Sequence, residues 1–236
     1  MEIKGFVHLS LVDWDGKLSS VLFLPRCNFR CPFCHNYALV LHPEEEETIP
    51  LDRVEGYLRT HKDWLDGVCV TGGEPTVHAD LPEFCSRLKD LGLAVKLDTN
   101  GANPLMLKGL IAEGLVDYVA VDIKAPLTVE RYSRAIGVDA KNFLGEVKET
   151  VGMLLNSGMD YEFRTTVVPI LHHESDIEEI SCEIKGCKKY VLQRFDVSVK
   201  KKTLDPTFNG LKSFTDEEME TLLTVARKKV PNTTIR

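Results

Sequence analysis

Short apolar runs of strand length recur along the chain and alternate with stretches whose apolar residues have a helical spacing. Apolar runs between helical patterns are typical of parallel strands that are covered on both faces. The alternation therefore predicts an α/β fold with six rounds of strand and helix. The six predicted strands are Ser19–Leu24, Gly67–Thr71, Ala94–Thr99, Tyr118–Ile123, Tyr161–Val168 and Tyr190–Phe195.

Local signals predict where several helices begin and end. In a capping box, a polar side chain precedes an acidic one by three residues at a helix start. Such boxes are predicted at Asp80–Glu83, Ser175–Glu178 and Thr215–Glu218. An apolar stripe at helical spacing between Phe143 and Leu154 predicts another helix, with Gly158 as its C-terminal cap.

The number of strand and helix rounds limits the architecture. Six rounds are fewer than the eight that close a full barrel, so we predict a partial (β/α)6 barrel. The 236 residues contain no linker rich in proline, glycine and serine. They therefore predict a single domain over residues 1–236, with a core at about 19–200 and a C-terminal helix at about 215–229.

Composition and charge exclude several classes of protein. Apolar residues make up 43% and charged residues 28%, which excludes a disordered chain. No apolar run approaches a membrane span, and the first residues lack the pattern of a signal peptide. The net charge of -7 argues against general nucleic-acid binding. Seven cysteines, an odd number, are expected to stay reduced in the cytoplasm.

Polar residues follow the predicted strands in a regular way. The carboxyl ends of parallel strands meet at one edge of a sheet, where such folds place their chemistry. We therefore expect one site from the segments and residues at or near these ends: Cys27–Cys34, Gly72–Pro75, Asp98–Gly101, Asp122, Lys124, Arg164 and Gln193.

The first of these segments holds Cys27, Cys31 and Cys34 in a C-x3-C-x2-C loop. The loop is short enough for three thiolates to bind one cubane iron–sulfur cluster, which leaves one of its four irons open to a substrate. The alternative is a zinc site whose fourth ligand is His35 or a distant cysteine. Structural zinc motifs usually contain two C-x2-C-type pairs, so the spacing favours the cluster.

The other four cysteines show no such spacing. Cys69 lies in an apolar strand and Cys85 in a helix, so both are predicted to be buried apolar thiols. Cys182 and Cys187 are also predicted to be structural.

The cysteine loop, with Phe33 before its third cysteine, resembles the signature of the radical S-adenosylmethionine superfamily. Cys-Pro-Phe-Cys-His-Asn resembles more closely the activating enzymes of glycyl-radical enzymes. The resemblance implies a 4Fe–4S cluster on the three cysteines and S-adenosylmethionine on the open iron. It also implies a partial barrel of the radical SAM type, a glycyl-radical enzyme as protein substrate, and flavodoxin or ferredoxin as electron donor.

The same resemblance implies roles for residues at the strand ends. Gly72, Gly73 and Glu74 would hold the amino group of the methionine moiety, and Arg164 its carboxylate. Lys124 and Asp122 would contact the carboxylate and the ribose. Phe33 and His35 would line the adenine, although His35 also fits an ordinary surface or core histidine. Asp98, with Asp122, would hold a monovalent cation, and Gln193 is expected in the same cofactor site.

Two positions depart from the family pattern. Arg26 stands where a glycine usually precedes the first cysteine. The segment from Ser10 to Gly16 has Asp15 where proline is expected, which leaves the role of Asp13 open. Lys17, Arg26 and Arg30 would form either a basic dock for an acidic electron donor or a solvated loop.

Three functions remain open from the sequence. The leading one is an activase that makes a glycyl radical on a separate protein. The second keeps the radical chemistry but uses a small molecule or nucleoside, as in the similar 7-carboxy-7-deazaguanine synthases. The third is a non-catalytic iron–sulfur or zinc module, which gives no role to Gly72-Gly73-Glu74 or Arg164.

Overall fold

The computed structural model describes residues 1–197 and 202–236 and contains two compact units. The first unit comprises Met1–Asn28, Asn36–Thr99 and Leu105–Val119, and the second comprises Phe29–His35, Asn100–Pro104 and Ala120–Arg236. The predicted core end at about residue 200 lies outside the described residues. The single domain over residues 1–236 stays a prediction.

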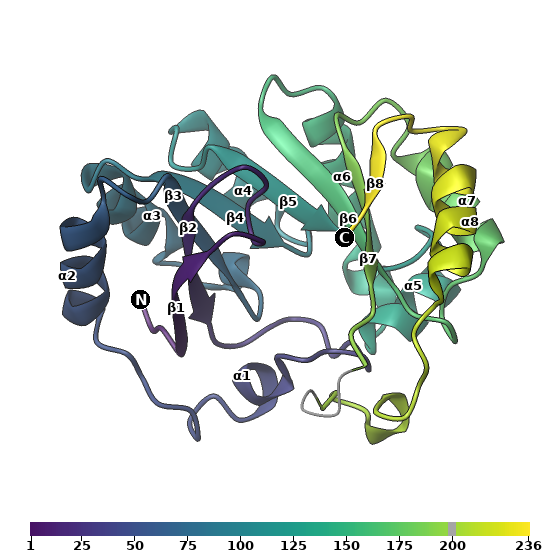
Figure 1. Cartoon of the computed structure of the whole chain (residues 1–236), viewed down its shortest axis with the longest axis horizontal. Coiled ribbons are helices and arrows are strands. Elements are labelled where there is room, and N and C mark those ends of the chain that lie inside the picture. Colours follow the sequence, from purple (N-terminus) through teal and green to yellow (C-terminus); the bar gives the residue numbers. More distant parts are fainter. Residues whose placement is uncertain (198–201) are drawn as a thin grey trace. The chain divides into compact units, whose positions relative to one another are not determined.

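The first unit is built on three parallel strands and one antiparallel strand. Strands β2 (Ser19–Leu24), β3 (Gly67–Gly72) and β4 (Ala94–Thr99) pair in parallel, and Val21, Cys69 and Lys96 lie side by side in register. Strand β1 (Gly5–Ser10) pairs antiparallel with β2 (Figure 1). The sequence did not predict β1, because its exposed apolar side chains carry no sign of burial on both faces.

Helices of the first unit follow its strands. They are α1 (Tyr37–Leu41), α2 (Leu51–His61), α3 (Leu81–Asp90) and most of α4 (Pro104–Ala112). The start of α3 was predicted correctly, but its capping box was wrong. The Asp80 carboxylate pairs instead with the N-terminal ammonium of Met1 at 2.7 Å, and no side chain caps the helix.

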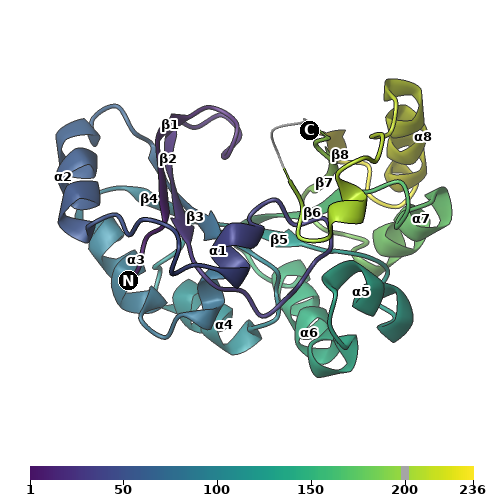
Figure 2. The same cartoon turned by 90° about the horizontal axis from the view of Figure 1, so that it is seen from below.

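The second unit repeats the alternation of strand and helix. Strands β6 (Asp160–Val167), β7 (Tyr190–Arg194) and β8 (Thr233–Ile235) pair in parallel, while β5 (Tyr118–Asp122) begins in the first unit and ends in the second. Its helices are α5 (Val129–Ile136), α6 (Leu144–Leu155), α7 (Glu174–Glu183) and α8 (Asp216–Arg227). Helices α7 and α8 lie side by side (Figures 1 and 2).

Helix ends in this unit test the remaining local predictions. The box at Thr215 is confirmed, because the Glu218 carboxylate accepts from the Thr215 amide at 2.7 Å and Thr215 Oγ1 accepts from the Glu218 amide at 3.2 Å. The box at Ser175 was wrong: α7 begins two residues earlier, and Asp176 accepts from the His173 amide at 2.8 Å. The Gly158 cap was also wrong, because α6 already ends at Leu155.

All six predicted strands are present with bounds that differ by one residue at most. The strand and helix alternation confirms the predicted α/β class. Cys69 and Cys85 are fully buried as predicted, whereas Cys182 is exposed and packs no core. Among the described residues, none of the helices combines the length and apolar character that crossing a bilayer requires.

Candidate functional site

The turn after β3 packs against the chain that leads to the first cysteine. A Cβ on Gly73 would lie 1.8 Å from the Arg26 carbonyl oxygen, and Gly72 has φ +115°. The amides of Gly73 and Glu74 donate to the Leu24 and Arg26 carbonyls, each at 2.8 Å. Both glycines are therefore required by close backbone approach, which fixes the segment just before Cys27.

Arg26, where the family has glycine, has φ +64°. This left-handed conformation costs a residue with a Cβ about 1–2 kcal/mol, and glycine adopts it freely. Hydrogen bonds hold the strained residue: its amide donates to Leu39 O at 2.8 Å, and its carbonyl accepts from Glu74. The departure from the family pattern thus keeps the backbone shape that a glycine would have there.

Glu74 is a buried carboxylate, only 1% exposed, at the end of this turn. Its Oε1 accepts from Thr76 Oγ1 at 2.6 Å, from the Thr76 amide at 3.1 Å and from Thr99 Oγ1 at 2.7 Å. Thr99 ends β4, so the ends of β3 and β4 meet at Glu74, as the strand-end argument predicted for this unit. Hydrogen bonds from three donors compensate for the burial of the carboxylate and fix its orientation.

Asp98, at the end of β4, has a cationic partner on its own strand. The Lys96 ammonium forms an ion pair with Asp98 Oδ1 at 3.1 Å and donates a hydrogen bond to the Asp13 carbonyl. The Asp13 side chain accepts from Ser10 Oγ at 2.5 Å. Asp13 therefore closes its own loop with its side chain and holds Lys96 with its backbone.

In the second unit, Cys31 and Cys34 lie in a tight turn. The Cys34 amide donates to the Cys31 carbonyl at 3.0 Å, and the Arg30 amide donates to Ile136 O at 2.8 Å at the end of α5. Gly137, with φ +68°, brings its backbone so close that a Cβ would lie 2.0 Å from the Arg30 carbonyl oxygen. The C-terminal end of α5 thus holds the cysteine turn in place.

Cys31 is buried, and burial raises the pKa of its thiol to about 12, against the lowering effect of the nearby Lys124 charge. A metal ion or cluster that binds this sulfur must displace its proton, because the ligand is the thiolate.

Three charged side chains gather beside these cysteines. Asp122 accepts from Lys124 Nζ at 2.8 Å on one oxygen and from Arg164 Nε at 2.9 Å on the other. Burial opposes ionisation of Asp122, but the two cations outweigh it and hold the pKa of the carboxyl well below its usual value. Burial likewise opposes the charge of Lys124, yet Asp122 raises the pKa of the ammonium above its usual value.

Hydrogen bonds between buried side chains and the backbone hold the chain segments that carry this charged group. His172 is fully buried; its Nδ1 accepts from the Val168 amide at 2.9 Å, so Nε2 carries the proton and donates to the Lys124 carbonyl at 2.9 Å. Burial lowers the pKa of His172, which keeps the ring neutral. Thr165 Oγ1 donates to the Ile123 carbonyl at 2.8 Å.

The aromatic residues of the loop contact residues at the end of β7. The His35 ring stacks on Phe195 with a centroid distance of 5.2 Å, and Phe33 meets Phe195 edge to face at 6.5 Å. Lys124 Nζ lies 5.9 Å from the Phe33 ring centroid. Gln193, on β7, is half-buried, and its side chain makes no hydrogen bond within the described part of the chain. Their contacts with a cofactor stay predictions.

Tyr132 is a residue that the sequence analysis missed. It is fully buried on α5, its hydroxyl has no hydrogen-bond partner within the described residues, and Phe29 packs edge to face on its ring at 6.5 Å. Burial raises the pKa of the phenol above its usual value, against the lowering effects of the Lys124 charge and of a backbone contact with Lys124. A tyrosine at an apolar helix position gave no signal beyond core packing.

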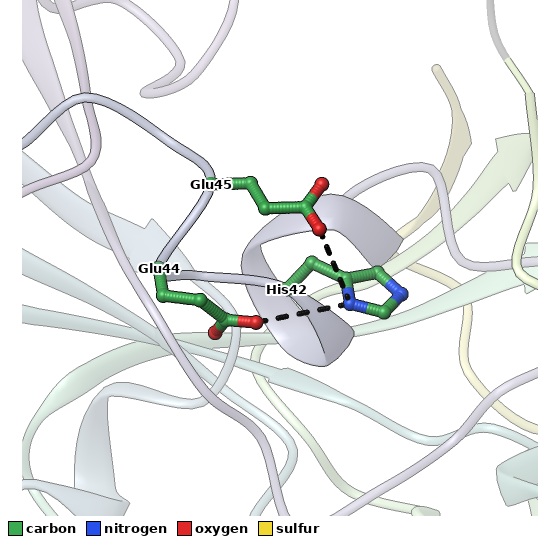
Figure 3. A group of neighbouring side chains, drawn as sticks. All are labelled: His42, Glu44 and Glu45. Atoms are coloured by element: carbon green, nitrogen blue, oxygen red, sulfur yellow. Dashed lines mark ion pairs between the residues drawn. The ribbon is translucent and has the colours of Figure 1, made fainter.

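Metal-ligating side chains gather closely at one place in the described part of the chain. Ligand atoms of His42, Glu44 and Glu45 lie within 4.8 Å of one another, and all three residues are exposed (Figure 3). His42 Nδ1 lies 3.9 Å from Glu44 and 4.0 Å from Glu45. These side chains belong to an exposed loop after α1, where acidic groups are common without a metal ion.

The zinc alternative can be tested inside the second unit. Zinc–sulfur bonds of about 2.3 Å place the sulfurs of one zinc site about 4 Å apart. In the described part of that unit, Cys31, Cys34 and His35 form no group with ligand atoms within 4.8 Å of one another. The zinc alternative, which also needs Cys27, stays a prediction.

Comparison with known proteins supports the resemblance in the motifs. The family model for the radical SAM superfamily matches residues 21–181. The chain is 32% identical, over 99% of its own length and 95% of the relative's, to "Putative glycyl-radical enzyme activating enzyme MJ1227" of Methanocaldococcus jannaschii. It is 28% identical to the GTP 3′,8-cyclase of Helicobacter pylori over 65% of this chain and 47% of that protein.

Solved structures show the same fold. SuiB of Streptococcus suis aligns over 92% of this chain with a TM-score of 0.67 at 15% identity. The chain spans about half, 50%, of the length of SuiB. The likeness confirms the predicted α/β fold of the radical SAM type. The chain belongs to the radical SAM superfamily, as its cysteine loop predicted.

Proposed function

We propose that this protein is an iron–sulfur oxidoreductase that cleaves S-adenosylmethionine reductively and generates a glycyl radical on a separate enzyme. Membership of the superfamily implies a 4Fe–4S cluster and S-adenosylmethionine. The observation that carries the proposal is the group of Asp122, Lys124 and Arg164 in the same unit as Cys31 and Cys34. The name of the relative with 32% identity supports the glycyl-radical target.

The proposed cofactor site uses the chemistry of each side chain. Cys27, Cys31 and Cys34 offer three soft thiolates, the donors that iron–sulfur clusters use. Arg164 and Lys124 carry two positive charges against the single charge of Asp122, so the group favours an added carboxylate such as that of the methionine moiety. Glu74 would accept from the methionine ammonium, with Gly72 and Gly73 allowing close approach.

A bound, reduced cluster would supply one electron to break the C5′–S bond of S-adenosylmethionine, which would give methionine and a 5′-deoxyadenosyl radical able to take a hydrogen atom from the target. Phe33 and His35 are proposed to flank the adenine with their ring faces. Cys31 is buried, which would limit the access of water to a cluster bound there.

Electron spin resonance tests this function. The protein, reconstituted with iron and sulfide and reduced, is incubated with S-adenosylmethionine and the glycyl-radical enzyme encoded nearest to it. We expect a protein-borne glycyl doublet that is absent without S-adenosylmethionine. Formation of 5′-deoxyadenosine without a protein radical on any glycyl-radical enzyme offered would reject the target and leave the radical chemistry.

The second candidate is a radical enzyme that acts on a small molecule or nucleoside. It is favoured by the similarity to GTP 3′,8-cyclase over 65% of this chain. Mass spectrometry of nucleotide mixtures after turnover distinguishes the two, because this candidate requires a modified low-molecular-weight product in amounts that match 5′-deoxyadenosine.

The proposed electron donor, flavodoxin or ferredoxin, needs a place near the cysteine turn. In the second unit a hollow of about 810 Å³ is lined by Arg30 and Pro32 of that turn, and by Arg134 and Ile170. Asp139 and Asp205 also line the hollow, so an acidic donor would be attracted only where it contacts the two arginines directly. An Arg134→Glu protein should then be reduced more slowly by flavodoxin and at an unchanged rate by dithionite.

A further inference from the structure

A buried hydroxyl on α5 has no acceptor for its proton. Tyr132 is fully buried, and its hydroxyl makes no hydrogen bond within the described residues. Buried polar groups in native proteins nearly always have a partner, and the exceptions occur where an ion, a ligand or a redox centre supplies it. The Tyr132 hydroxyl therefore indicates a partner that becomes available only in another state of the protein.

Contacts within the second unit hold Tyr132 against the segment that carries Cys31. The Phe29 ring packs edge to face on the Tyr132 ring with a centroid distance of 6.5 Å. The Arg30 amide donates to the Ile136 carbonyl, at the end of α5, at 2.8 Å. Phe29 and Arg30 are the two residues before Cys31, so ring packing and a backbone hydrogen bond together fix α5 to the cysteine turn.

Three side chains are near enough to act on the Tyr132 hydroxyl. Burial has the largest effect on its pKa and raises it, and Lys124, Cys31 and Asp122 also influence that pKa. The Lys124 ammonium can only donate. The Asp122 carboxylate already accepts from Lys124 on one oxygen and from Arg164 on the other. Of these three side chains, Cys31 is left as the acceptor.

The strength of Cys31 as an acceptor depends on whether its sulfur binds metal. A thiol is a weak acceptor, whereas a metal-bound cysteine sulfur is a thiolate. A negative charge on the acceptor shortens a hydrogen bond and strengthens it. In the cluster-free protein the phenol thus has no strong acceptor, which agrees with its lack of a hydrogen bond. Binding of the cluster to Cys31 would create one.

We propose that the Tyr132 hydroxyl donates a hydrogen bond to Cys31 Sγ when this sulfur binds the cluster, and that the bond raises the reduction potential of the cluster. The inference rests on the proposed function, which supplies the cluster. A reduced cluster carries one more negative charge than an oxidised one, so a donor at its sulfur stabilises the reduced form more. The hydroxyl keeps its proton in both forms, and one electron from the reductant is their only difference. Tyr132 acts through Cys31 and is therefore a positioning residue.

The reduction potential of the reconstituted protein tests the proposal. The full chain is loaded with iron and sulfide and titrated with titanium(III) citrate in the absence of S-adenosylmethionine, and electron spin resonance follows the reduced cluster. Tyr132→Phe removes the hydroxyl and keeps the ring. We expect its one-electron reduction equilibrium constant to be about tenfold smaller than that of wild type, which corresponds to a potential about 59 mV lower.

Tyr190→Phe is the matched control. Tyr190 is also fully buried in the second unit, but its hydroxyl donates to Thr165 Oγ1 at 2.8 Å and so has a partner without any cluster. This variant should have the potential of wild type. Equal potentials in wild type and Tyr132→Phe, as expected for a hydroxyl that bonds only to water, would overturn the proposal. An equal fall of the potential in both variants would overturn it too.

Thermal unfolding of the cluster-free protein is the second measurement, and it needs no metal. Tyr132→Phe should melt at the wild-type temperature or above it, because its hydroxyl has no partner to lose. A melting temperature lowered as much as in Tyr190→Phe would reveal a partner in the cluster-free protein and contradict the proposal. Formation of 5′-deoxyadenosine is a separate readout: a lower potential in Tyr132→Phe without product from wild type would reject the proposed function and support the role of Tyr132.

Discussion

Two half-buried carboxylates at strand ends have different partners in the two units. Asp98, after β4 in the first unit, pairs with one lysine on its own strand. Asp122, at the end of β5 in the second unit, binds both Lys124 and Arg164. Lys96 brings one positive charge to Asp98, whereas Lys124 and Arg164 bring two to Asp122. We propose that the two cations beside Asp122 prepare that group for an anionic ligand.

The largest expected effect removes the lysine beside Asp98. Lys96→Met should lower the free energy of unfolding by about 3–5 kcal/mol, because it takes a positive charge away from a largely buried carboxylate. Denaturant unfolding measures the loss. Arg164→Met, the matched change in the second unit, should cost less stability, since Lys124 still neutralises Asp122. Equal losses would break the distinction between the two groups.

The next effect concerns ligand affinity. Arg164→Met should weaken binding of S-adenosylmethionine to the reconstituted protein by about 10- to 100-fold, the loss of a charged hydrogen bond worth about 1.5–3 kcal/mol. Equilibrium dialysis measures the affinity. Arg131→Met is the control, because Arg131 pairs with Asp176 and Glu179 instead of Asp122. Unchanged affinity in Arg164→Met would contradict the proposed binding of the methionine carboxylate by Arg164.

The pH dependence of stability sharpens the comparison further. The pKa of Asp122 is lower in the folded protein than the unfolded value of about 3.9. Its ionised form therefore stabilises the fold above that pH, and the contribution is lost as the pH falls toward the folded pKa. Wild type should exceed Asp122→Asn by about 1–3 kcal/mol at pH 7, and the gap should shrink below about pH 4. A stability difference that widens as the pH falls would contradict a lowered pKa of Asp122 in the folded protein.

The smallest expected effect concerns the buried phenols of the second unit. Tyr132→Phe removes a hydroxyl without a hydrogen-bond partner in the described residues, so it should leave stability unchanged or raise it by about 1 kcal/mol. Tyr190→Phe is the matched control, since its hydroxyl donates to Thr165 at 2.8 Å, and it should lower stability by about 1 kcal/mol. A loss in Tyr132→Phe as large as in the control would reveal a bond at Tyr132.

Much of this fold could be predicted from the sequence because it rests on local periodicity. Apolar runs between helical patterns located the six strands, and the cysteine spacing located the loop. The partners of Asp98 and Asp122 depend on which side chains meet in space, and no spacing rule supplies that. One signal was available for Lys96: a lysine inside an apolar strand covered on both faces requires a buried counter-charge.

The local misses have equally specific causes. The Asp80 box failed because the Met1 ammonium pairs with the Asp80 carboxylate. The Ser175 box failed because α7 begins two residues earlier, with Asp176 and not Glu178 accepting at its first turn. Arg26 departs from the family's glycine in side chain but keeps its backbone conformation. A sequence motif records residue types and not dihedral angles, so it does not show which backbone conformation a substituted residue adopts.

Reductive cleavage of S-adenosylmethionine tests the central claim most directly. Wild-type protein and two variants, Cys31→Ala and the exposed-cysteine control Cys182→Ala, are reconstituted, reduced and assayed for 5′-deoxyadenosine. The account predicts product from wild type and Cys182→Ala and none from Cys31→Ala, because two thiolates no longer hold the cluster with its open iron. Undiminished product from Cys31→Ala, or wild-type protein that binds zinc without sulfide and forms no product, would contradict it.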